Sequence, residues 1–187
     1  MEQKEGSYES FLLGFEESYG YLSGGYVRDK DAVDGSMLIC EMASYYKRQG
    51  KTLVDAMNDL YETYGYYQNA TLNFGFEGED GMKAMAKIME TLRKESPSQI
   101  AGFRVVGWSD YQRSVRSDEG EESPISLPKS NVLEYRLENG SKLIVRPSGT
   151  EPKIKCYLLA HGSTVQACEQ VLQHLRRAVP ALLGPQD

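Results

Sequence analysis

The sequence predicts a helical layer first and then a separate small antiparallel sheet covered by helices, which is an α+β arrangement. Helical spacing of apolar residues dominates residues 31–94, and short strand-like runs separated by turn signals follow from residue 103. Between them lies the polar, proline-containing break at residues 95–99. Such breaks commonly separate domains, so we expect one domain at residues 1–95 and a second at 100–187.

The first part is expected to open with a short apolar run typical of a buried strand, followed by a loop and then irregular structure or a hairpin. Two helices follow. The first is capped by Asp31 or Asp34, and the second is opened by Thr52 with Asp55 at the N3 position. The expected elements are a strand at 11–15, helices at about 31–50, 52–65 and 81–94, and a strand at 66–76. Their apolar stripes are interpreted as buried core, including the methionines of residues 81–94.

The second part is expected to contain mainly short strands. Asn139-Gly140 between two strand-like runs is the favoured two-residue hairpin turn. The charged segment 113–129, with two prolines, is interpreted as an exposed loop. The other expected elements are strands at 103–107, 132–137, 142–145 and 153–159, and a closing amphipathic helix at 163–179 that Pro180 ends.

Composition limits the possible functions. The 187 residues carry 21 Lys and Arg against 27 Asp and Glu, a net charge of −6. An acidic surface does not attract nucleic acid, so any anionic ligand needs a locally positive pocket. No apolar run is long enough for a transmembrane helix and no signal pattern is present, so no membrane partner is expected. Three well-separated cysteines (Cys40, Cys156 and Cys168) are interpreted as buried free thiols in a reducing, cytoplasmic compartment.

The segment from Arg146 to Lys155, Arg-Pro-Ser-Gly-Thr-Glu-Pro-Lys-Ile-Lys, joins two predicted strands. Ser148, Gly149 and Thr150 can turn hydroxyls and backbone N–H groups toward one point, with Gly149 free to take a positive φ. Arg146 adds a planar fork suited to phosphate oxygens, and Lys155 adds a second cation. The pattern predicts a pocket for one phosphate monoester; a turn with incidental basic residues is the alternative.

A second segment, Gly-Phe-Glu-Glu-Ser-Tyr-Gly, carries Glu16, Glu17 and Ser18 on a loop after an apolar run. Two carboxylates and a hydroxyl can bond to the hydroxyls of a polyol, but they also fit a solvated turn. The following Arg28-Asp29-Lys30-Asp31 also fits an ion-paired helix start. No nucleotide-binding loop or nucleophile elbow is present, and no cluster suggests a metal site.

These segments resemble the α-D-phosphohexomutases, the phosphoglucomutase/phosphomannomutase family. The loop from Arg146 resembles the phosphate-binding loop of that family's C-terminal domain, and Phe-Glu-Glu-Ser-Tyr-Gly resembles the sugar-binding loop of its third domain. The Arg28–Lys30 stretch resembles the segment that follows that loop. The resemblance runs over essentially the whole chain. It implies the later part of an α/β third domain followed by a fourth domain with a sheet like that of the TATA-box-binding protein.

The resemblance also implies an activity: interconversion of hexose 1-phosphate and hexose 6-phosphate, with glucose or mannose as the sugar, through a bisphosphate intermediate. By position, Glu16 and Ser18 would bond to sugar hydroxyls, Glu17 lies between them, and Arg28 and Lys30 would lie near the sugar and its phosphoryl group. The phosphate that is not transferred would be held at the second loop by Arg146, Ser148, Gly149, Thr150, Lys153 and Lys155.

The family's phosphoryl-carrying serine, in a Thr-x-Ser-His-Asn-Pro type motif, and its Asp-Gly-Asp type Mg²⁺ loop do not occur in this sequence. We therefore expect no catalytic or metal-binding residue here. Mg²⁺ and a hexose 1,6-bisphosphate are implied only for a parent enzyme that supplies the first two domains and the start of the third. The alternative is a stand-alone, non-catalytic module that binds sugar phosphate or mediates an interaction.

Overall fold

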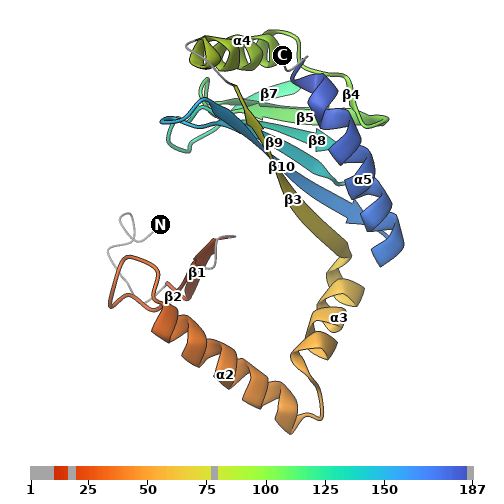
Figure 1. Ribbon diagram of the computed structural model, residues 1–187. Coiled ribbons are helices and arrows are strands. Elements are labelled where there is room, and N and C mark those ends of the chain that lie inside the picture. Colours follow the sequence, from red (N-terminus) through yellow and green to blue (C-terminus); the bar gives the residue numbers. More distant parts are fainter. Residues whose placement is uncertain (1–10, 17–19, 77–79, 185–187) are drawn as a thin grey trace. The chain divides into compact units, whose positions relative to one another are not determined.

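In the computed structural model, which describes residues 11–16, 20–76 and 80–184, the chain divides into two units between Leu60 and Tyr61 (Figure 1). The structure therefore corrects the boundary expected at residues 95–99. Strand β3 (Tyr66–Gly75) and helix α4 (Gly81–Lys94), expected in the first domain, belong to the second unit. A polar proline break marks a connection in the chain, and here the segments before and after it contribute to one core.

The first unit is held together by local contacts. Strands β1 (Leu13–Glu16) and β2 (Gly20–Ser23) form an antiparallel hairpin, and helix α2 (Ala32–Arg48) follows. Asp31 is the N-cap, accepting bonds from the N–H groups of Val33 and Asp34, and this decides between the two expected caps. The backbone N–H and the hydroxyl of Ser23 each donate to the Asp34 carboxylate at 2.7 Å, which ties the hairpin to the helix.

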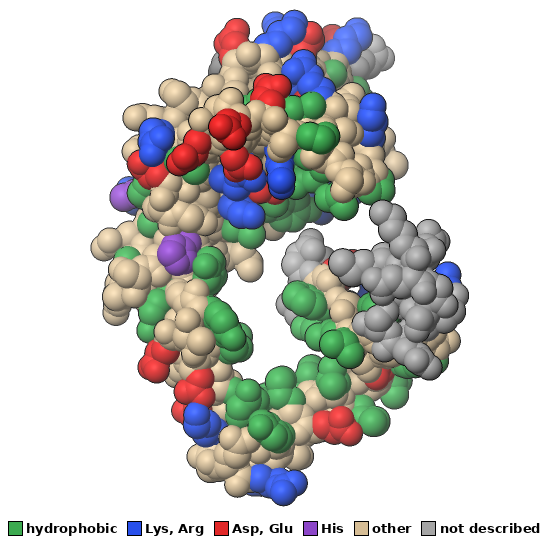
Figure 2. All heavy atoms as spheres, turned by 180° about the vertical axis from the view of Figure 1, so that it is seen from behind, with side chains coloured by type: hydrophobic (Ala, Val, Ile, Leu, Met, Phe, Trp, Pro, Cys, Tyr) green, Lys and Arg blue, Asp and Glu red, His purple; other side chains and the backbone are tan. Residues whose placement is uncertain are grey.

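Helix α3 (Leu53–Tyr64) begins with the predicted reciprocal cap: Thr52 donates from its backbone to Asp55, and the Asp55 N–H donates to the Thr52 hydroxyl. The prediction that the apolar stripes of these elements are buried is wrong. Phe15, Val33 and Leu60 are 75%, 80% and 50% exposed, and Cys40 is exposed as well. Figure 2 shows such hydrophobic side chains on the surface of this unit. Periodicity predicted the helices correctly, but it does not supply a surface for them to pack against.

The second unit is an antiparallel sheet of eight strands with order β3-β10-β9-β8-β5-β6-β7, and β4 pairs with β5. Helix α4 and helix α5 (Val165–Leu182) bury their apolar faces in one cluster with the sheet (Figure 1). Met85 and Met89 lie in this core as predicted, whereas Met82 is 49% exposed. The remaining strands are β4 (Gln99–Ile100), β5 (Phe103–Asp110), β6 (Val115–Asp118), β7 (Glu121–Pro124), β8 (Leu133–Leu137), β9 (Lys142–Pro147) and β10 (Lys153–Gly162).

Three predictions about the second unit need correction. Part of the expected loop 113–129 forms the β6–β7 hairpin, turned by Glu119 and Gly120 with positive φ, and its charges suit an edge of the sheet. The β8–β9 turn has three residues rather than two, because Leu137 donates to the Ser141 carbonyl and Gly140 takes a positive φ. Helix α5 continues through Pro180 to Leu182, since a proline in the last turn costs few helical bonds.

Candidate functional site

The β9–β10 connection presents two cations side by side. Arg146 and Lys155 are directly opposite each other in the antiparallel register. Their neighbours Val145, Ile154 and Cys156 are fully buried in the core. Because side chains alternate along a strand, Arg146 and Lys155 project from the face of the sheet opposite that core.

Among the residues that the structure describes, neither cation is neutralised by a carboxylate. Within the described ranges, no Asp or Glu oxygen lies within ion-pair distance of Arg146 or Lys155. Lys153 differs, because it is paired with Glu151. The hydrogen bond and charge of Lys153, with a smaller contribution from the charge of Lys155, lower the pKa of the Glu151 carboxyl. Two cations that no described carboxylate compensates form a local positive site in a chain of net charge −6.

The backbone of the loop adds donors at the same place. The N–H groups of Thr150 and Glu151 both point at the Ser148 hydroxyl oxygen, at 3.4 and 3.3 Å, and the Ser148 N–H donates to the Lys153 carbonyl at 2.8 Å. The two longer bonds are weak, so an anion oxygen can compete for those N–H groups. Gly149 does not take the positive φ that the sequence suggested, because the turn closes without it; a Cβ there would meet nothing within 4 Å.

All six residues predicted to bind phosphate line one hollow of about 360 Å³. The hollow is formed by Arg146, Pro147, Ser148, Gly149, Thr150, Glu151, Lys153 and Lys155. Its donors and cations suit one phosphate group.

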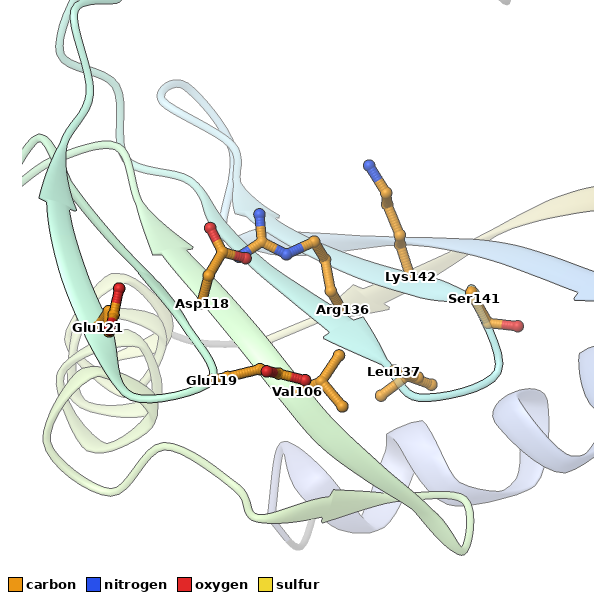
Figure 3. Close-up of a pocket in the computed structure, with 9 residues that line it drawn as sticks. Val106, Asp118, Glu119, Glu121, Arg136, Leu137, Ser141 and Lys142 are labelled. Carbon is orange, nitrogen blue, oxygen red and sulfur yellow. The ribbon is translucent and has the colours of Figure 1, made fainter.

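A larger hollow of about 760 Å³ lies elsewhere on the same unit, near the β6–β7 and β8–β9 turns (Figure 3). It also contains two cations, but both are paired. Arg136 lies 2.5 Å from a carboxylate oxygen of Asp118, and Lys142 lies 3.5 Å from Glu134. Its charges are compensated within the protein, so size alone does not make it the better anion site.

The sugar-binding candidates lie in the first unit. Glu16 ends β1, and the Lys30 ammonium lies 3.7 Å from its carboxylate and 3.2 Å from that of Asp29. The Asp29 hydrogen bond, then the charges of Asp29 and Glu16, raise the pKa of Lys30. The structure thus brings Glu16 and Lys30 together, and Arg28 is exposed nearby in the chain. Glu17 and Ser18 lie outside the described residues.

The described residues do not form a metal site. Among them, no group of three or more His, Cys, Asp or Glu side chains is placed to hold a metal ion. The described residues therefore do not fit the Mg²⁺ that the resemblance implies for a parent enzyme. None of the helices in the described ranges is long and apolar enough to cross a membrane.

Family models match both units of the chain. The phosphoglucomutase/phosphomannomutase C-terminal domain matches residues 72–176, and the α/β/α domain III of the same enzymes matches residues 1–64. The chain belongs to the phosphoglucomutase/phosphomannomutase family. The two matches are separated only by residues 65–71, close to the division at Leu60, so the β9–β10 loop lies in the C-terminal domain and Glu16 and Lys30 lie in domain III.

Individual relatives agree with this assignment. The chain is 41% identical over 170 residues to a phosphoglucomutase of Staphylococcus haemolyticus and 41% identical over 153 residues to one of Staphylococcus aureus. These alignments cover 89% and 81% of this chain but only 30% and 28% of the relatives. In fold, the chain resembles the open form of Paramecium pp63/parafusin, titled a phosphoglucomutase, with a TM-score of 0.59 and 16% identity, covering 92% of this chain and 31% of that one.

One residue near the site was missed by sequence reasoning. Asn73 on β3 is opposite Lys155 in the register, on the exposed face of its strand. The alternation of residues 66–75 indicates which side chains share a face, but only the pairing of β3 with β10 brings Asn73 beside the loop.

Proposed function

We propose that this chain is the substrate-binding, C-terminal part of a phosphohexomutase that interconverts hexose 1-phosphate and hexose 6-phosphate through a bisphosphate intermediate. Its task is to hold the phosphate that is not being transferred, at the loop between β9 and β10. The observation that carries this proposal is the opposed pair Arg146 and Lys155, which has no carboxylate partner among the described residues and flanks the convergent N–H groups of the loop.

The roles follow from the chemistry of each group. The Arg146 guanidinium donates in its plane to two phosphate oxygens, and the Lys155 ammonium supplies a compact charge on the neighbouring strand. Ser148 and the N–H groups of Thr150 and Glu151 bond to remaining oxygens. In domain III, Glu16, Glu17 and Ser18 would bond to sugar hydroxyls, with Arg28 and Lys30 near the sugar. The free thiols Cys156 and Cys168 fit a reducing, cytosolic compartment.

We expect the chain alone to bind sugar phosphate without turning it over, because phosphoryl transfer needs a positioned donor and charge neutralisation by a metal. Neither the serine motif nor the Asp-Gly-Asp type metal loop occurs in this sequence. A coupled assay with glucose 1-phosphate and Mg²⁺ checks this expectation, and measurable turnover would contradict it.

Titration of the ¹⁵N-labelled chain with glucose 6-phosphate tests the binding proposal. We expect chemical-shift changes at residues 146–155 and a dissociation constant raised ~10–100-fold by Arg146→Ala, since hydrogen bonds to charged groups contribute ~1.5–3 kcal/mol. Arg176→Ala, which removes an exposed arginine of α5, is the matched control and should leave binding unchanged. Equal binding by both variants and the unmodified protein would overturn the proposal.

A further inference from the structure

The three outermost strands at one edge of the sheet place three side chains in a row. Antiparallel register sets Arg146 of β9 opposite Lys155 of β10, and Lys155 opposite Asn73 of β3. Directly opposed residues point to the same face, so all three project from the side that α4 and α5 do not cover.

Asn73 is available to a ligand. It lies on the exposed face of β3, and within the described ranges its side chain has no hydrogen-bond partner. Next to it on the same face is Gly75, opposite Lys153, where a Cβ would meet nothing within 4 Å. The described residues therefore leave the surface beside the cations open on the β3 side.

The other side of the cation pair offers no such group. Strand β8 begins at Leu133, which is opposite Val145, so β8 has no residue in register with Arg146. In this row, the cation pair therefore has a polar neighbour on the β3 side, Asn73, and none on the β8 side. A ligand bound by Arg146 and Lys155 that extends along the row meets the Asn73 amide.

Distance decides which part of a ligand Asn73 contacts. Neighbouring strands are ~4.8 Å apart, so Asn73 lies ~10 Å from Arg146, measured across two strand spacings. A phosphate centred on the opposed cations is satisfied by them and by the loop N–H groups. A carboxamide, with both donor and acceptor atoms, matches a hydroxyl group, which also donates and accepts.

We propose that Asn73 is a specificity-determining residue of this site, which binds a hydroxyl of the sugar attached to the phosphate and so distinguishes a sugar phosphate from inorganic phosphate. The inference rests on the proposed function, because it requires a phosphate at Arg146 and Lys155.

The test is a titration of the full chain with glucose 6-phosphate and, separately, with inorganic phosphate. Asn73→Ala should raise the dissociation constant for glucose 6-phosphate ~3–10-fold, the value of one neutral hydrogen bond, and leave that for inorganic phosphate within about twofold. Asn69→Ala is the matched control: it removes the same side chain from the same face of β3, opposite Leu159 instead of Lys155, and should change neither constant.

A second variant checks the adjacency to Lys155. Asn73→Asp places a carboxylate beside that lysine and should weaken the binding of both ligands, since it neutralises one of the two cations. Unchanged binding of inorganic phosphate by Asn73→Asp would contradict the row geometry.

The outcomes separate the two proposals. If glucose 6-phosphate binds, Arg146→Ala weakens its binding and Asn73→Ala does not, the role of Asn73 is overturned and the phosphate site stands. Equal weakening of both ligands by Asn73→Ala also overturns the specificity role. If the unmodified chain binds neither ligand, both proposals are wrong.

Discussion

The two units of this chain use the same kind of amphipathic sequence with different results. In the second unit, eighteen residues from the sheet, α4, α5 and the C-cap of α5 form one buried cluster. In the first unit, among described residues, Ala56 is the buried hydrophobic side chain, and most apolar residues of α2 and α3 are exposed. Helical stability comes mainly from packing an apolar face, so the first unit depends on caps and turns where the second depends on its core.

The largest expected effect is a difference in the free energy of unfolding lost when one leucine of each unit is replaced by alanine. Leu158→Ala removes a fully buried side chain of β10 and should lower the free energy of unfolding of the second unit by ~2–5 kcal/mol. Leu60→Ala, at a leucine 50% exposed on α3, should cost less than ~1 kcal/mol. Urea denaturation measures both losses, followed by circular dichroism for the two units and by the fluorescence of Trp108, on β5, for the second unit. Equal losses would show that the first unit has a core of its own.

A smaller effect is expected where β10 meets α5. A Cβ at Gly162 would lie 2.4 Å from the backbone nitrogen of Cys168, so Gly162→Ala forces the helix away from the strand and should cost ~1–3 kcal/mol. Gly149→Ala in the β9–β10 loop is the control, because its Cβ meets nothing within 4 Å. Thermal unfolding distinguishes them; a Gly149→Ala loss as large as that of Gly162→Ala would contradict the geometry of the loop.

The charge of the β9–β10 loop gives a third prediction. Glu151 is paired with Lys153 and adds a negative charge to the hollow, so Glu151→Gln frees the lysine and should tighten glucose 6-phosphate binding ~2–5-fold. Glu138→Gln, which removes a carboxylate paired with Arg104 away from the hollow, should leave binding unchanged. Weaker binding by Glu151→Gln would show that Glu151 supports the loop instead of competing with the anion.

The smallest effect is expected at the start of α2. Hydrogen bonds from the Asp34 backbone and from Tyr26 lower the pKa of the Asp31 carboxyl, and the same bond to Asp31 raises the pKa of Tyr26 to about 12. A carboxyl whose pKa is lower in the folded state than in the unfolded state stabilises the folded state at any pH above its unfolded-state pKa. This stabilisation is lost as the pH falls through the folded-state pKa. Backbone chemical shifts of residues 32–36 should therefore move toward coil values below about pH 4, and Asp31→Ala should show the coil-like shifts already at neutral pH.

Local signals were sufficient to predict most elements from the sequence. Such signals depend only on neighbouring residues. The structure confirms three of them: Asp31 as the cap of α2, the Thr52–Asp55 cap of α3 and the boundaries of α4. Burial depends on long-range pairing, which explains the wrong expectation for Phe15 and Cys40 and the boundary expected at 95–99. Similarly, loop chemistry indicated the residues from Arg146 to Lys155, whereas Asn73 joins them only through the β3–β10 register.

Native-state amide hydrogen exchange on the full chain tests the contrast between the units most directly. We expect the amides of Leu143, Val145, Cys156 and Leu158 to exchange only through global unfolding of the second unit, and those of α2 and α3 to exchange orders of magnitude faster through local opening. Equally high protection across α2, α3 and the β9–β10 strands in a monomeric sample would contradict the account.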